Sequence, residues 1–155
     1  MKIIIKNISW TFIANLISAI TKWLILVLIA RWLDPNDLGS YSLAFAITAP
    51  ITLFINLKLR PLVVTDKNLT FSNYVFTRKI TSALAIILII IIGLVLYPSY
   101  FWVITLVGLM KILDLHSDLY YSIPQINNDF DYIGKLIIFK HVITLISFFL
   151  NTLLN

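Results

Sequence analysis

ALAIILIIIIGLVL, residues 83–96, decides the fold of this chain. The run carries no polar side chain, so a helix formed here has no face suited to water. Together with the residues beside it, the stretch 75–97 is long enough, at about 20 residues, to cross a hydrocarbon core of ~30 Å. The run therefore predicts a transmembrane helix.

Four further stretches repeat this pattern. Hydrophobic residues make up 60% of the sequence and charged residues 12%, against about 45–50% and about 25% in soluble domains. No segment has the composition of a soluble domain. The sequence predicts an all-α, polytopic transmembrane bundle of about five helices, at approximately 8–33, 38–57, 75–97, 100–123 and 132–154.

Several classes of site are excluded by composition. The chain has no cysteine, which rules out disulfides, thiolate metal sites and cysteine nucleophiles. Its two histidines, His116 and His141, are too far apart in sequence for a convincing zinc site, so we expect no metal and no cofactor. The net charge of +5 comes from basic residues beside the apolar segments, as in membrane topology signals rather than a nucleic-acid-binding face.

The basic residues near the helix ends indicate how the chain lies in the membrane. One side carries nearly all of them, and the other carries Arg31. Lysine and arginine are enriched in cytoplasmic loops, so we expect a cytoplasmic N-terminus and, after five helices, an outer C-terminus. The residues on the expected cytoplasmic side are Lys2, Lys6, Lys58, Arg60, Lys67, Arg78, Lys79, Lys111, Lys135 and Lys140.

The first predicted helix carries a polar face made of Asn7, Thr11, Asn15, Ser18 and Lys22. Their spacing of three or four residues places them on one side of a helix. For the neutral residues, hydrogen bonding to another helix and a water-filled cavity are both open interpretations. A lysine at the depth of Lys22 costs about 2.5–3.5 kcal/mol unless it reaches water or an anion. The helix end is on the order of 16 Å away, which is far to snorkel, so Lys22 favours the cavity.

A second polar face follows the fourth predicted helix, at Lys111, Asp114, Asp118 and Gln125. Lys111 and Asp114 are spaced to pair within the helix, which would give a self-neutralised patch. The alternative is a cavity wall with a titratable carboxylate. His116 is rotated by about 200° from Asp114 on a helix, so these residues cannot converge on a metal ion.

Two other positions in the predicted helices have two interpretations each. Pro50 in the second helix frees a backbone carbonyl and can kink the segment, either as part of a transport path or as a tolerated proline. Arg78, with Lys79, begins the third helix and is most simply a cytoplasmic anchor.

Three stretches, taken in order, resemble bacterial polysaccharide flippases of the multidrug/oligosaccharidyl-lipid/polysaccharide exporter superfamily. IARWLDPNDLGSYSLAFAITAPI (29–51) is similar to the first loop and second helix of that family. NLKLRPLVVTD (56–66) with FSNYVFTRKIT (71–81) resembles the connection before the third helix in O-antigen-type members. KILDLHSDLYYSIPQ (111–125) resembles the end of the fourth helix. The residues that fit the family patterns are Asp34, Pro35, Asp37, Leu38, Gly39, Tyr41, Asp118 and Gln125.

This resemblance implies an all-helical transporter of the bacterial inner membrane, with two halves of about six helices each around a central cavity. This chain would be the N-terminal part of such a two-bundle fold. The implied substrate is a polyprenyl-diphosphate-linked oligosaccharide, turned to the outer leaflet by alternating access and without enzymatic chemistry. The implied partners are this substrate, membrane lipids, the second half of the fold and other polysaccharide-assembly membrane proteins.

The implied substrate suggests roles for the polar residues, because a diphosphate is bound by cations and sugar hydroxyls by neutral polar side chains. We expect diphosphate contacts from Lys22, Arg78 and Lys111, sugar contacts from Thr11, Asn15 and Gln125, and ion or proton coupling at Asp118 and Asp114.

Two alternatives belong to other classes. A membrane-embedded enzyme of lipid or glycan metabolism would use Asp114, His116 or Asp118, although their wide separation around a helix argues against it. A drug exporter of the same superfamily would favour an acidic, aromatic cavity over Lys22.

Overall fold

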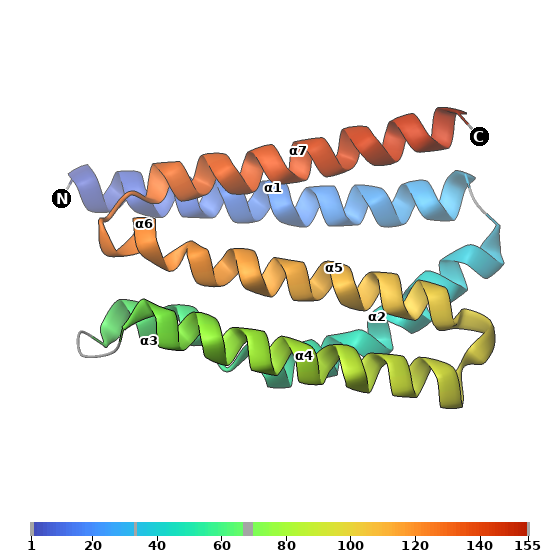
Figure 1. The fold of residues 1–155 in the computed structure, drawn as a ribbon. Coiled ribbons are helices and arrows are strands. Elements are labelled where there is room, and N and C mark those ends of the chain that lie inside the picture. Colours follow the sequence, from blue (N-terminus) through green and yellow to red (C-terminus); the bar gives the residue numbers. More distant parts are fainter. Residues whose placement is uncertain (1, 33, 67–69, 155) are drawn as a thin grey trace. The chain divides into compact units, whose positions relative to one another are not determined.

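The computed structural model describes residues 2–32, 34–66 and 70–154, shown as a ribbon in Figure 1. Every regular element in this part of the chain is a helix, which confirms the all-α prediction. In chain order the elements are α1 (Lys2–Trp32), α2 (Pro35–Asn56), α3 (Leu59–Thr65), α4 (Phe71–Leu96), the 3₁₀ turn η1 (Pro98–Tyr100), α5 (Phe101–Tyr120), α6 (Ser122–Ile126) and α7 (Phe130–Leu154).

Five helical segments within the described residues are long and apolar enough to cross a membrane, as the prediction of a polytopic bundle requires. The connection expected between the second and third helices contains the short helix α3, which was not predicted. Leu33, the expected end of the first helix, and Lys67, counted among the topology charges, lie outside the described residues. The segments are Ser9–Trp32, Pro35–Thr65, Phe71–Leu96, Pro98–Ile126 and Phe130–Leu150.

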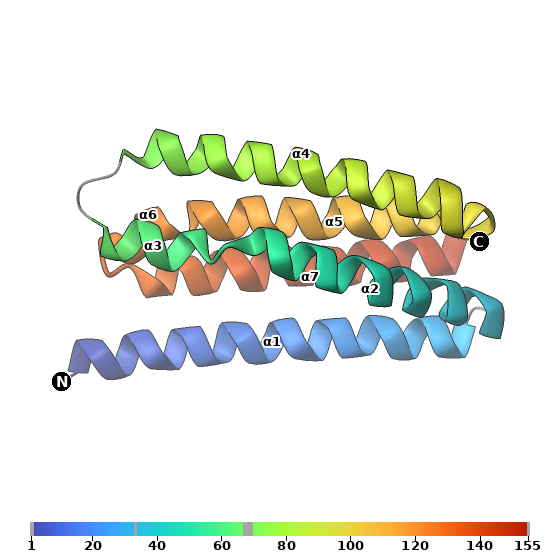
Figure 2. The ribbon, with the colours of Figure 1, turned by 90° about the horizontal axis from the view of Figure 1, so that it is seen from below.

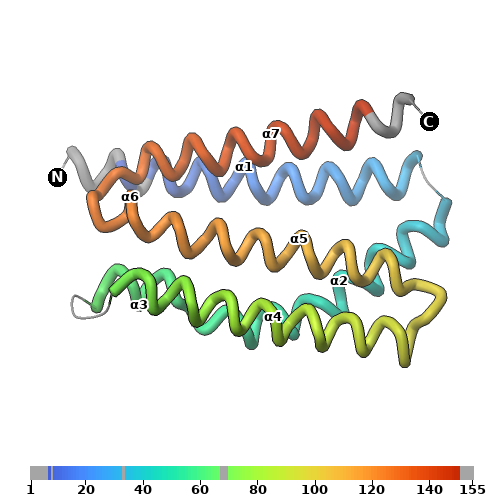
Figure 3. Tube along the Cα trace, in the orientation of Figure 1, coloured from blue at the N-terminus to red at the C-terminus, as the bar shows by residue number. Residues whose placement is uncertain are grey.

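The chain divides into two compact units, one of residues 1–38 and 123–155 and one of residues 39–122. In the first unit, α1 and α7 lie side by side and run in the same direction (Figures 1 and 2). Figure 3 traces α1 in blue and α7 in orange to red, both running toward the same end. A first and a fifth membrane crossing must be parallel, because each crossing reverses the direction of the chain.

A glycine allows the two helices of the first unit to approach closely. A Cβ added at Gly134 of α7 would lie 3.1 Å from Trp10 Cε3 and 3.3 Å from the Trp10 carbonyl oxygen. Ala14 and Thr21 of α1 and His141 of α7 are buried as well. Small residues at such contacts are typical of membrane helix pairs, where close backbone approach supplies the packing energy.

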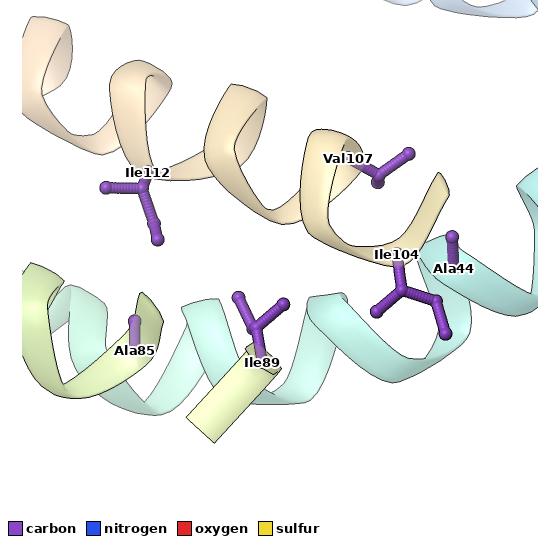
Figure 4. Packing of buried hydrophobic residues seen from close by; sticks show 6 residues of the cluster. All are labelled: Ala44, Ala85, Ile89, Ile104, Val107 and Ile112. Atoms are coloured by element: carbon purple, nitrogen blue, oxygen red, sulfur yellow. The ribbon is translucent and has the colours of Figure 1, made fainter. Parts of the chain in front are cut away.

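The second unit is built on the antiparallel hairpin of α4 and α5, closed by η1 (Figure 1). In its core Ile89 points from α4 toward α5 (Figure 4). Gly108 leaves the room for it, since a Cβ there would lie 2.7 Å from Ile89 Cδ1. The helix α2 adds one small residue to this core, which consists of Ala44, Ala85, Ile89, Ile104, Val107 and Ile112.

The helix α2 continues through Pro50 to Asn56. Next to the proline, the hydroxyl of Thr48 donates to the carbonyl oxygen of Ala44 at 2.7 Å, and that of Thr52 donates to the carbonyl oxygen of Thr48 at 2.9 Å. Both threonines are buried and bonded to their own helix. The interruption of this membrane segment therefore lies beyond the proline, after Asn56.

Candidate functional site

A break separates α2 from α3 within the candidate membrane span Pro35–Thr65, after the 22 residues of α2. Figure 2 shows the two helices joined by a short non-helical step. Here Leu57 and Lys58 have φ angles of 49° and 46°, in the left-handed region. That conformation costs a non-glycine residue roughly 1–2 kcal/mol, so it persists only where neighbouring groups hold it.

Arg78 of α4 holds the α2 side of this break. Its Nη1 donates to the carbonyl oxygen of Ile55 at 3.2 Å, and its Nη2 donates to the carbonyl oxygen of Asn56 at 2.9 Å and to Asn56 Oδ1 at 3.3 Å. The last carbonyls of a helix have no partner within the helix, and a cation is favourable at that end of the helix dipole. Arg78 is 0% exposed. It therefore acts as a buried C-terminal cap for α2, supplied by another helix.

Asp118 of α5, predicted as a coupling residue, pairs with Arg60 of α3. The Nη1 of Arg60 and the Oδ1 of Asp118 are 3.0 Å apart, and the two side chains are 22% and 39% exposed. The Arg60 guanidinium also lies 5.7 Å from the centre of the Tyr121 ring, within range of a cation–π contact. This pair ties α3 to α5 at the other side of the break.

Apolar contacts also hold α3. Leu59 and Val63, four residues apart and so on one face of the helix, are buried with Tyr74 of α4 and Leu119 of α5. In a membrane segment such contacts contribute through close packing rather than through removal of apolar surface from water. The apolar cluster thus packs one face of α3 against α4 and α5, and the partly buried ion pair fixes where the end of α3 sits.

Lys111, predicted to face a substrate cavity, is placed against α2. Its Nζ donates to the carbonyl oxygen of Phe45 at 3.3 Å and lies 3.5 Å from the centre of the Phe45 ring. This combination satisfies the ammonium group with a carbonyl and an aromatic face. Asp114, one turn further along α5, is half-buried.

His116 is oriented by its own helix. Its Nδ1 lies 3.2 Å from the carbonyl oxygen of Ile112 and 3.4 Å from the Oγ of Ser82 on α4. The described residues contain no group of three or more metal-ligating side chains. The helical separation of His116 from Asp118, which pairs with Arg60, gives no acid–base constellation of the kind that the enzyme alternative needs.

The polar face of α1 belongs to the first unit and is largely open. Thr11, Asn15 and Lys22 are exposed, and Asn7 and Ser18 are half-buried. Lys22 lies ten residues before the end of α1 at Trp32, which is about 15 Å along the axis. The three exposed side chains are therefore not fully covered by α7.

Gln125, expected to contact sugar, lies half-buried in the short helix α6 of the first unit. In the turn that follows, the pKa of Asp129 is raised, chiefly by its side-chain hydrogen bond with Asp131 and then by burial. Asp131 also lies 4.0 Å from Lys135, one turn into α7. A carboxyl–carboxyl hydrogen bond and one acid–base pair thus lie at the start of α7.

The structure brings together a cluster that the sequence did not show, formed by Asn56, Arg60, Arg78 and Asp118. Arg60 was counted only as a topology charge, and its partner lies 58 residues away. No periodic pattern connects a residue in a polar connection with one on a later helix. The one available signal in the sequence was that Arg60, in the connection between the second and third predicted helices, and Asp118, on a polar face, carry opposite charges.

Comparisons with known proteins agree with the resemblance seen in the sequence. A family model described as "Polysaccharide biosynthesis protein" matches residues 4–124. The capsular polysaccharide biosynthesis protein CapF of Staphylococcus aureus is 33% identical over 146 residues, which cover 94% of this chain and 37% of CapF. The chain thus spans little more than a third of the length of this curated relative. No solved structure matches the chain significantly.

Proposed function

Because the chain belongs to the polysaccharide biosynthesis protein family, we propose that it serves to transport a polyprenyl-diphosphate-linked oligosaccharide from the cytoplasmic to the outer leaflet of a bacterial plasma membrane. The chain is a membrane protein by family and by the five apolar helical segments found among its described residues. The relative CapF is named for capsular polysaccharide biosynthesis. A lipid-linked precursor is the form of such a polysaccharide that we expect a membrane-spanning protein to bind.

The observation that carries this proposal is the placement of Lys22. It is an exposed cation near the middle of the membrane segment Ser9–Trp32, on the same face as Thr11 and Asn15. A charged group at this depth is expensive unless it meets water or an anion. A mobile diphosphate head group within a hydrated path is an anion of the right charge, and neighbouring hydroxyl and amide groups suit sugars.

The other predicted contacts differ from Lys22 in availability. Arg78 caps α2 and Lys111 binds the Phe45 carbonyl, so we assign the first contact with the diphosphate to Lys22. We keep Arg78, Lys111 and Gln125 as proposed contacts later in the path. Coupling at Asp118 and Asp114 likewise remains a proposal.

The mechanism that we propose needs no bond-breaking chemistry. The polar face of α1 would bind the head group while the polyprenyl tail stays in lipid. Alternating access then requires segments near each membrane face to take two positions around this site. We therefore treat the protein as a transporter and not as an enzyme.

Removing the gene from its native strain tests this function. A missing transporter leaves the lipid-linked oligosaccharide complete, so we expect it to accumulate while surface polysaccharide is lost. A missing enzyme would instead leave a shorter or chemically altered intermediate. Mass spectrometry of lipid extracts distinguishes these outcomes, and an incomplete oligosaccharide would refute the transport proposal.

The same proposal requires a defined orientation, with the N-terminus in the cytoplasm. Because residues 1–155 contain no cysteine, a single cysteine placed among them can be compared directly with the unchanged protein. Ser99→Cys and Asn127→Cys both replace exposed residues, in the turn before α5 and in the loop before α7. An impermeant thiol reagent applied to intact cells should label Ser99→Cys and not Asn127→Cys, with lysed cells as the control for reactivity. The opposite pattern would invert the topology.

A further inference from the structure

We propose that the Arg60–Asp118 ion pair is a latch that sets the position of α3 during transport. Arg60 would be a positioning residue, acting through α3 rather than by touching substrate. This inference rests on the proposed transport function. It concerns a break in a membrane segment that neither the family match nor the relative assigns to any role.

The break is held from both sides by side chains of the α4–α5 hairpin. Arg78 of α4 bonds the last carbonyls of α2, and Asp118 of α5 bonds Arg60 of α3. Between these two contacts lie Leu57 and Lys58, both in the left-handed region. The conformation of this step thus depends on both contacts rather than on glycine or proline at the step itself.

The two contacts differ in how easily they can open. Arg78 is fully buried and makes three hydrogen bonds to α2. Arg60 and Asp118 remain 22% and 39% exposed, so water or an anion can compete for either charge. The α2 side is therefore the fixed side of the break, and the α3 side is the one that opens.

Opening this pair has a defined structural consequence. The helix α3 is only seven residues long, and the step before it is strained. Without the ion pair, α3 keeps the small apolar cluster around Val63 and loses its charged contact with α5. Its end can then move away from α5 while α2 stays capped. Such a short segment with two positions is the kind of element that alternating access needs.

The exposure of Val63 measures this movement directly. Val63 is 8% exposed and is buried in a cluster with Tyr74 and Leu119. A Val63→Cys variant therefore reports movement of α3 away from this cluster through its rate of reaction with a thiol reagent. The variant is introduced at the native locus, and labelling is measured on open membrane sheets that the reagent reaches from both faces. We expect Arg60→Ala or Asp118→Asn to raise the labelling rate about five- to tenfold.

An exchange of the two charges separates a latch from a merely structural role. Arg60→Asp together with Asp118→Arg should bring the labelling rate back toward the starting level, while either change alone should raise it, and Arg60→Ala should lower surface polysaccharide. Lys79→Ala, which removes an exposed positive charge from α4, is the matched control and should change neither readout.

Each other outcome overturns the proposal. An unchanged labelling rate in Arg60→Ala would show that the pair does not hold α3. Faster labelling with normal polysaccharide would show that the position of α3 does not matter for transport, and would leave the proposed function intact. Failure of the proposed function itself would appear instead as an incomplete oligosaccharide in the gene deletion.

Discussion

Replacing Lys22 with alanine should abolish surface polysaccharide and leave the amount of protein in the membrane unchanged. Lys22 is exposed on α1 about 15 Å from the helix end, so its removal should disturb little packing. The substitution also removes a charge that must be kept hydrated or paired at this depth. Insertion and stability should therefore hold or improve, while binding of the diphosphate is lost.

Two further variants sharpen this result. Lys22→Arg keeps the positive charge and should retain part of the activity, because a guanidinium also binds phosphate but with a different reach. Leu26→Ala changes an exposed apolar residue of the same helix and should leave polysaccharide normal. Polysaccharide assays and immunoblots on strains edited at the native locus provide the measurement. Normal polysaccharide in Lys22→Ala would reduce Lys22 to a snorkelling or packing residue.

The membrane spans were predictable because their cause is local. A run such as residues 83–96 has no polar side chain, so only lipid or a protein interior can surround it. Positive-charge asymmetry likewise needs only counting. These features depend on the residue types within one segment, and no knowledge of tertiary contacts is required.

The break after α2 was not predictable in the same way. Pro50 was the visible candidate for an interruption, yet the helix runs through it to Asn56. Leu57 and Lys58, which do interrupt it, carry no glycine or proline signal. Their conformation is held by Arg78 and by α3 contacts from elsewhere in the chain. A local sequence rule fails where the decisive partner is distant.

The role of Arg78 shows the same limit at the candidate site. From sequence it was an anchor at a helix start or a substrate contact, because arginines there commonly face water. In the structure it is 0% exposed and bonded to α2. Whether it also meets substrate stays a prediction, but its structural role can be tested separately.

Arg78→Ala should destabilise the protein by roughly 3 kcal/mol or more. Two carbonyl oxygens, of Ile55 and Asn56, lose a partner, at about 1–3 kcal/mol for each group left unsatisfied. The missing side-chain methylenes add a cavity, at about 0.8 kcal/mol per buried CH₂. Removing a buried charge works in the opposite direction. We expect the first two contributions to win, because the left-handed step at Leu57 also loses its support.

The thermal unfolding midpoint in detergent measures this effect, with Lys79→Ala as the neighbouring control. Lys79 is exposed and carries the same charge, so its loss tests charge removal without loss of the cap. Arg78→Leu should fall between the two, since leucine restores apolar volume but donates no hydrogen bond to the end of α2. If Arg78→Ala unfolds at the same temperature as Lys79→Ala, the cap contributes nothing measurable. The left-handed step would then have to be held by the α3 contacts alone, and Arg78 would be free to act on substrate.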